Sequence, residues 1–247
     1  MAWPFERKME DSLLATRLVP RLTTRYISAV AAFAAIQAVV SVIPFSITIG
    51  VSGSITLGVV TAPLIGLLLG PIPGGIAVLL GAFIGLFLNP AGAVFGFLTP
   101  LPSALGAVAT GCIRIKRGYV PGAIILLSVA AFYSHPFGRE AMFYPWLNIA
   151  AMILTFSPIA SLAASYFASA QLKKNAVAVA LAAFVGTLTD HAFGSALAIW
   201  YYNLPPGIWN LVMYVYPLER LATVAIVTII GTLVYHRVKL SGMMSAI

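Results

Sequence analysis

Charge is scarce in this chain: only 8% of its 247 residues are charged, with 14 Lys and Arg against 6 Asp and Glu. The apolar fraction is 61%, and the mean hydropathy is +1.01. A soluble protein of this length needs a far larger polar surface than this composition supplies. The composition therefore argues against a sizeable soluble domain and predicts an integral membrane protein.

Cysteine, histidine and catalytic motifs are scarce as well. The single cysteine, Cys112, excludes an intramolecular disulfide and a cysteine cluster for zinc or iron–sulfur. The three histidines are far apart in the sequence, and no HExxH, GxSxG or Walker A motif occurs. We therefore expect no enzyme activity, no cofactor and no bound metal, and we expect a partner to perform any ATP-driven work.

Long apolar blocks alternate with short polar links along the chain. A bilayer core about 30 Å thick needs roughly 20 apolar residues per helical span. We therefore expect an all-α fold, a polytopic transmembrane helix bundle of about eight spans, with six as the lower bound. The expected spans are 26–44, 55–70, 76–88, 91–113, 119–134, 146–170, 176–202 and 217–235.

These spans make one membrane domain over 26–236, followed by a short tail over 237–247. Residues 1–25 mix apolar and basic side chains, which is typical of an amphipathic helix on the membrane surface or of a partly disordered tail. Gly and Pro at 70–75 predict a tight turn. Pro100 and Pro102 predict a kink or a break in the fourth span.

The net charge of +8 comes from basic clusters in the N-terminal tail, in two short links and at the C-terminus. With the N-terminus placed inside, the clusters at 114–117, 173–174 and 237–239 all fall on the cytoplasmic side. Basic residues flanking apolar spans set topology and contact anionic lipid. We therefore expect a multi-pass cell-membrane protein with both termini cytoplasmic and with no role in binding nucleic acid.

Two neighbouring ionisable residues, Asp190 and His191, lie near the middle of the seventh span. Helical spacing places Thr187 and Asp190 on a face of mainly small or polar residues. An ionisable group at membrane depth is costly unless it is paired or faces water, and such groups are usually functional. The segment is interpreted as a substrate-binding or proton-handling site, with a structural polar clamp as the alternative.

A second candidate group lies at the outer end of the bundle. Glu219 stands beside Arg220 in the first turn of the last span, where it either complements the helix dipole or anchors a ligand. Trp209 and Asn210 belong to an aromatic-rich outer loop, which predicts an interfacial belt or stacking walls for a ring-containing ligand. The candidate substrate-binding set is thus Asp190, His191, Thr187, Glu219, Trp209 and Asn210.

The stretch 26–90 has an alanine-rich first helix ending in Ser41-Val42-Ile43-Pro44-Phe45, then the segment 61–71 and a glycine-rich third helix. In these features it resembles the substrate-binding S component of energy-coupling-factor transporters. The surroundings of Asp190 and the Pro217-Leu218-Glu219-Arg220 opening are similar to that family's last two helices. An apparent extra helical pair lies at 119–170.

This resemblance implies capture of a vitamin-like micronutrient from outside, together with a membrane T component and two cytoplasmic ATPases. It also implies that small residues on the first helix contact the T component, with Ala31, Ala35 and Ala38 as candidates. We expect a solute-uptake protein of this kind. The alternatives are a stand-alone secondary transporter or channel with an Asp190 site, and a non-transport membrane scaffold.

Overall fold

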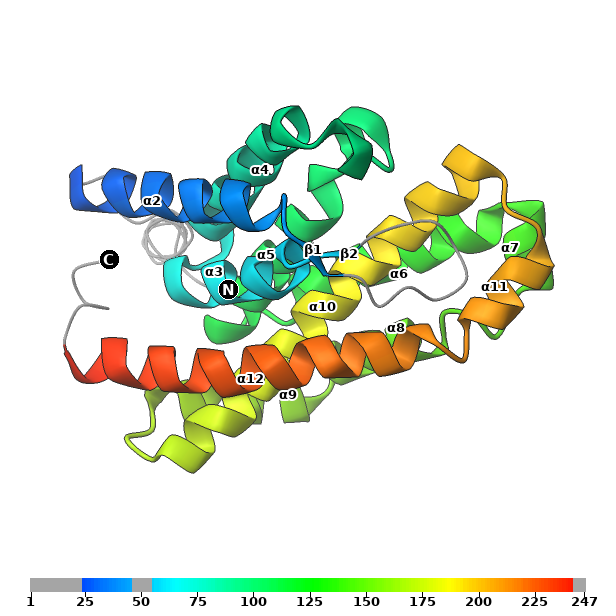
Figure 1. Cartoon of the computed structure of the whole chain (residues 1–247). Helices are drawn as coiled ribbons and strands as arrows, with labels where there is room; N and C mark the ends of the chain where they lie inside the picture. The colour runs from blue at the N-terminus through cyan, green and yellow to red at the C-terminus, as the bar shows by residue number, and fades with distance from the viewer. Residues whose placement is uncertain (1–23, 46–54, 242–247) are drawn as a thin grey trace, which may run out of the picture.

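The computed structural model describes residues 24–45 and 55–241, and nearly all of this part of the chain is helical, as predicted (Figure 1). The surface segment expected over 1–25 lies outside the described residues, apart from its last two positions, which begin α2. Two two-residue strands, β1 (Pro44–Phe45) and β2 (Ile55–Thr56), pair antiparallel. The helices are α2 (Thr24–Val40), α3 (Gly58–Leu69), α4 (Pro71–Leu88), η1 (Pro90–Gly92), η2 (Gly96–Leu98), α5 (Pro100–Arg114), α6 (Tyr119–Ser134), α7 (Pro136–Glu140), α8 (Trp146–Phe156), α9 (Pro158–Ser165), η3 (Tyr166–Ala168), α10 (Leu172–Tyr202), α11 (Pro206–Val212) and α12 (Tyr216–Leu240).

Several of these helices are long and apolar enough to cross a membrane. Four meet both criteria: Pro71–Leu88, Gly96–Arg114, Leu172–Tyr202 and Tyr216–Leu240. A fifth span is possible if Trp146–Phe156 and Pro158–Ala168, bent by 70° at their break, cross as one unit. Three further apolar helices are shorter: Tyr26–Val40, Gly58–Leu69 and Tyr119–Ser134. Each range expected as a span thus contains a helix.

Prolines place two helix boundaries differently from the sequence prediction. The expected turn at 70–75 was too long: Gly70 alone turns the chain, at φ 88°, and α4 begins at Pro71. Proline suits the first turn of a helix because the amide hydrogens there have no intrahelical partner. For the same reason Pro100 begins α5, so the break expected in the fourth span lies directly before this proline. The candidate span here is Gly96–Arg114, and the expected start at residue 91 was too early because Pro90–Gly92 forms the separate short helix η1.

The long helix α10 runs through the centre of the molecule and contacts α3, α5, α6, α8, α9 and α12 (Figure 1). Helices α2 to α5 pack together on one side of it. The C-terminal end of α3 is hydrogen-bonded to two neighbouring helices. Arg114 Nη1 donates to the carbonyls of Leu67 and Leu68 at 2.6 and 2.8 Å, and Tyr26 Oη donates to the carbonyl of Leu69. A cation at a helix C-terminus complements the dipole there.

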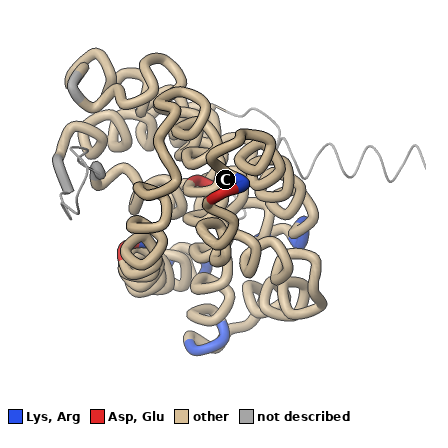
Figure 2. Tube along the Cα trace, turned by 90° about the vertical axis from the view of Figure 1, so that its right-hand side faces the viewer, with Lys and Arg blue, Asp and Glu red and all other residues tan. Residues whose placement is uncertain are grey.

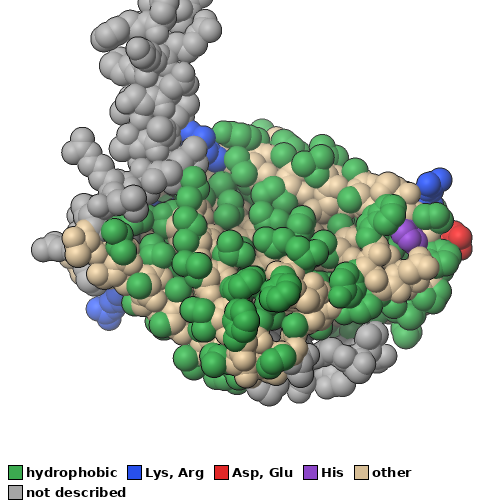
Figure 3. Space-filling model, turned by 90° about the horizontal axis from the view of Figure 1, so that it is seen from above, with side chains coloured by type: hydrophobic (Ala, Val, Ile, Leu, Met, Phe, Trp, Pro, Cys, Tyr) green, Lys and Arg blue, Asp and Glu red, His purple; other side chains and the backbone are tan. Residues whose placement is uncertain are grey.

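The surface of the bundle is strongly apolar. Large side chains such as Phe87, Phe97 and Leu218 are about 70% exposed, at 69%, 73% and 71%. Figure 3 shows hydrophobic side chains across the middle of the molecule and charged ones at its two ends. In Figure 2, seen from the end that carries α7 and α11, charged positions are few. An exposed apolar surface of this extent is expected to contact lipid.

Helices α5 and α10 cross at Gly106 and Gly186, where their backbones come very close. A Cβ added at Gly186 would lie 1.9 Å from Thr110 Oγ1 and 2.9 Å from the Gly106 carbonyl oxygen. Small residues allow membrane helices to approach in this way. The crossing brings the next turn of α10, which carries Asp190, against α5.

Replacing Gly186 with Ala should therefore force the two helices apart. We expect G186A to lower the free energy of unfolding by about 1–3 kcal/mol, the usual cost of overpacking. The matched control is G207A in α11, because a Cβ added there meets nothing within 4 Å. Thermal unfolding in detergent checks the difference, and equal stability of the two variants would contradict the close crossing.

Candidate functional site

A pocket of about 330 Å³ lies between the segment 90–99 and helices α3, α5, α10, α11 and α12. Its lining combines charged, polar and aromatic side chains. Those that enter the argument are Phe95, Ser103, Tyr144, Asp190, His191, Ser195, Trp209 and Arg220. The pocket's size falls at the lower end of the roughly 300–1,000 Å³ typical of small-molecule sites.

An ion pair joins α10 to α12 at this pocket. Arg220 Nη1 lies 3.4 Å from Asp190 Oδ2, and only 12% of either side chain is exposed. Ser103 Oγ on α5 lies 3.5 Å from Asp190 Oδ1. These distances are long for charge-assisted hydrogen bonds, which are usually about 2.7–2.9 Å. The pair is therefore loosely held, and the carboxylate keeps acceptor capacity toward the pocket.

Arg220 is shared between two carboxylates. Its Nη2 lies 3.6 Å from Glu219 Oε1, and the Glu219 side chain is 13% exposed. Within the described part of the chain, Arg220 Nε has no hydrogen-bond partner. With both carboxylates ionised, the three side chains carry one net negative charge, and one guanidinium nitrogen remains unused.

His191 also lines the pocket, and both of its ring nitrogens belong to a polar network. Its Nδ1 lies 3.1 Å from Asn148 Oδ1, and its Nε2 lies 3.2 Å from Tyr144 Oη. Because an amide oxygen only accepts, Nδ1 carries the proton, and Nε2 of the neutral ring accepts from Tyr144. Burial raises the pKa of the Tyr144 phenol, so this hydroxyl stays protonated and able to donate.

The network continues into the neighbouring elements. Ser195 Oγ lies 3.0 Å from Tyr144 Oη and donates to the His191 carbonyl at 2.8 Å. The Tyr216 ring stacks on His191 with centroids 4.3 Å apart, and its hydroxyl donates to the Tyr144 carbonyl. These contacts join α10, α8, α12 and the turn before α8, as expected of the structural clamp that the sequence left as an alternative for this segment.

Aromatic side chains at this end of the molecule divide into two groups. Phe132, Tyr144, Trp209 and Tyr216 are buried and packed together, with the Tyr144 and Trp209 rings 4.7 Å apart. The second group is exposed: Phe143, Trp146, Trp200, Tyr201, Tyr202 and Tyr214. From the first group, Tyr144 and Trp209 line the pocket. The second group has the exposure expected of an interfacial belt.

The six residues predicted for substrate binding therefore lie in different places. Asp190, His191 and Trp209 line the pocket, and Glu219 contacts it through Arg220. Thr187 is fully buried one turn below, and its hydroxyl has no partner in the described structure. Asn210 is exposed and does not line the pocket, since α11 turns Trp209 inward and its neighbour outward.

The candidate partner surface on α2 is smaller than predicted. Ala31 and Ala35 are exposed, but Ala38 is only 5% exposed. Ala38 is covered because glycines on α4 let the two helices approach closely: a Cβ added at Gly85 would lie 3.5 Å from the Ala38 carbonyl oxygen. Only Ala31 and Ala35 of the three remain accessible to another protein.

The sequence prediction missed several pocket residues. Arg220 was noted only as the neighbour of Glu219 and was left out of the candidate set, although an intramembrane charge calls for a partner. Ser103 follows Pro102, in a segment that was interpreted only as a kink or a break in a span. Tyr144 was not in the candidate set, because nothing in its local sequence distinguishes it from its exposed neighbour Phe143.

Comparisons with known proteins give one relative. The chain is 33% identical over 161 residues to an uncharacterized protein of the archaeon Methanocaldococcus jannaschii. The matched stretch covers 65% of this chain and 52% of that protein. The matched stretch thus spans about half the length of the relative. No protein-family model matches the chain, and no solved structure matches it.

The ion pair makes a prediction about stability. R220M removes the charge that Asp190 faces, and a buried carboxylate left alone costs about 3–5 kcal/mol. The double variant D190N/R220M removes both charges and should recover much of this loss. Denaturation in detergent measures the cycle, with R139M as the control because Arg139 is exposed. A double variant no more stable than R220M alone would show that the two side chains are not coupled.

Proposed function

We propose that this protein is a membrane solute-uptake protein that binds a small molecule in the pocket beside Asp190. The observation that carries the proposal is the position of the Asp190–Arg220 pair. A purely structural ion pair between helices would be enclosed by packed side chains, whereas this pair lines a pocket with room for a ligand. Charged groups at membrane depth that face a cavity are functional by default.

The lining supports a solute that combines a ring with a positive or hydrogen-donating group. Asp190 has unused acceptor capacity, and the site carries one net negative charge when both carboxylates are ionised. Phe95, Tyr144 and Trp209 offer aromatic surface that suits a flat ring or a cation. A vitamin-like molecule with a protonated or amino-substituted ring has this chemistry.

The proposed topology has about eight crossings with both termini inside. Three basic segments lie at one end of the bundle: Lys239 Nζ donates to the carbonyls of Phe167 and Ser169, and Lys116 lies beside α9. Asp190, Glu219 and Arg220 lie toward the other end. The excess of Lys and Arg supports a cytoplasmic location for the first end. The pocket then opens toward the outer side, where an uptake protein meets its solute.

The mode of energy supply is proposed from the sequence resemblance. An S component of an energy-coupling-factor transporter has no motor of its own and works with a T component and cytoplasmic ATPases. The exposed Ala31 and Ala35 leave a small-residue face on α2 that a membrane partner can approach closely. This arrangement is consistent with a protein whose work is driven by separate subunits.

A stand-alone secondary transporter is the second candidate, and the ion pair favours it too. Protonation of Asp190 would release Arg220 and change the charge of the pocket, which is how a proton can be coupled to a solute. Uptake into vesicles that requires a proton gradient and no ATP would identify this mechanism in place of the ATPase-driven one.

Native mass spectrometry of the protein purified from its own membranes tests the proposed function. We expect the wild type to retain a small molecule that D190N loses, because Asn keeps the shape of the side chain but removes its charge. N210A is the matched control, since Asn210 does not line the pocket, and it should retain the molecule. A folded wild type without a bound small molecule, or retention by D190N, would contradict the proposal.

A further inference from the structure

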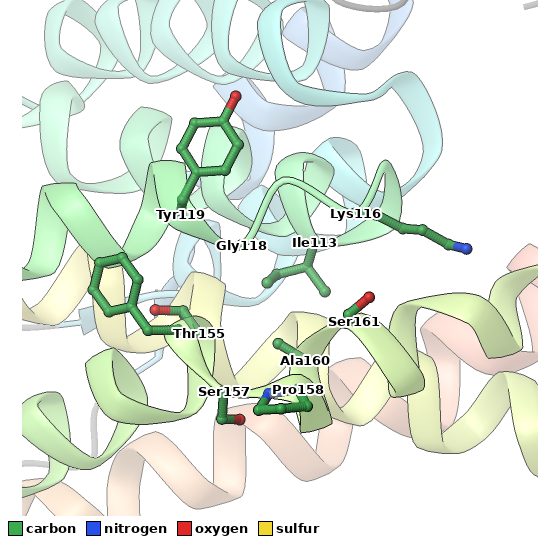
Figure 4. A pocket seen from close by; sticks show the side chains of 10 residues that line it. Ile113, Lys116, Gly118, Tyr119, Thr155, Ser157, Pro158, Ala160 and Ser161 are labelled. Carbon is green, nitrogen blue, oxygen red and sulfur yellow. The ribbon is translucent and has the colours of Figure 1, made fainter.

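A second cavity lies at the opposite end of the bundle from the Asp190 pocket (Figure 4). It measures about 380 Å³ and is formed by the link after α5, the start of α6 and the break between α8 and α9. The break exists because Pro158 begins α9 after a 70° bend, while Gly118 lets the link lie against α8. The solute site accounts for none of these residues.

The lining of this cavity is amphipathic. Lys116 supplies a cation, and Thr155, Ser157 and Ser161 supply hydroxyl groups. Figure 4 shows Lys116 and Ser161 on the same side of the cavity and the Tyr119 ring on the other. The apolar part comes from Ile113, Tyr119, Phe156, Pro158 and Ala160.

Lys116 adopts a backbone conformation that is costly for a lysine. Its φ is 62°, in the left-handed region that favours glycine. The amide of Arg117 donates to the Cys112 carbonyl at 2.8 Å, and that of Lys116 to the Ile113 carbonyl at 3.0 Å. This hydrogen-bond pattern ends a helix most easily with glycine at the Lys116 position. Retaining a lysine there, at a cost to stability, points to a use for its side chain.

Charge at this end of the molecule is of one sign. The described residues place seven cationic side chains here: Arg114, Lys116, Arg117, Lys173, Lys174, Arg237 and Lys239. The three acidic residues of the described part, Glu140, Asp190 and Glu219, belong to the other end. A basic pocket between membrane helices on the cytoplasmic side suits an anionic lipid headgroup.

We infer that the cavity beside Lys116 holds the negatively charged headgroup of a membrane phospholipid. The phosphate lies within reach of the Lys116 ammonium and the Ser161 hydroxyl. The glycerol and the first part of the acyl chains pack on the apolar lining and pass to the exposed Phe156 and Ile159, which are 56% and 59% exposed. The inference rests on the membrane location of the chain and not on the identity of its solute.

Titration of the purified protein with phosphatidylglycerol, against phosphatidylcholine as the uncharged reference, tests this site by native mass spectrometry. The wild type should bind one phosphatidylglycerol more tightly than any phosphatidylcholine. Because one Lys contributes about 1 kcal/mol to anionic-lipid binding, K116Q should weaken this binding about fivefold. K116R keeps the charge and should retain it.

The matched control is K173Q, which removes one exposed cation from the same end but does not line the cavity. It should bind phosphatidylglycerol as the wild type does. Equal losses in K173Q and K116Q would show a diffuse charge effect and overturn the site. Inorganic phosphate that competes fully with phosphatidylglycerol at millimolar concentration would identify a free-phosphate site instead, and would overturn the lipid.

A glycine variant separates the headgroup role from a role in folding. K116G relieves the left-handed strain, so its lipid-free thermal midpoint should rise above that of the wild type, while its preference for phosphatidylglycerol falls as in K116Q. A K116G variant that keeps the full preference would contradict the inference. If K116G does not fold, K116Q and K116R still decide it.

Discussion

The ion pair between Asp190 and Arg220 is the interaction on which the account of this molecule depends. A lone carboxylate in the middle of α10 would be very costly in an apolar bundle, and Arg220 at the start of α12 makes its position tolerable. The pair also fixes where the outer end of α12 lies against α10. The two side chains lie 3.4 Å apart and both line the pocket. The ion pair that joins the two helices therefore also presents charged groups to a solute.

The rest of the fold supports this pair from two sides. On one side, the glycine crossing of α5 and α10 brings Ser103 within 3.5 Å of Asp190. On the other side, His191 is held by Asn148 and Tyr144 and covered by Tyr216, which closes the back of the pocket. Adjacent residues of one helix therefore have different roles: Asp190 faces the cavity, and His191 fastens the wall behind it.

Much of the fold could be predicted from the sequence because a membrane-spanning helix requires a long run of apolar residues. Every expected span contains a helix. The differences lie at helix starts: α4 begins at Pro71, inside the expected turn, and the fourth candidate span begins at Gly96, later than expected. Asp190 could be predicted for the site because an ionisable residue is rare at membrane depth, and Trp209 because it lies in an aromatic-rich outer loop. The sequence could not predict the roles of Ser103 and Tyr144 or the pairing of Arg220 with Asp190, because these depend on which helices become neighbours. Asn210 lies outside the pocket because α11 directs it away from Trp209.

Thiol labelling of a pocket residue tests the central claim most directly, since it asks whether the Asp190 pocket opens to the outside. A cysteine placed at Ala198, which lines the pocket, should react with a membrane-impermeant maleimide added to intact cells. The native Cys112 is only 2% exposed and should stay unlabelled. K174C, at the basic end, should react only after the cells are made permeable. Labelling of A198C only after permeabilisation, or of K174C in intact cells, would contradict the account.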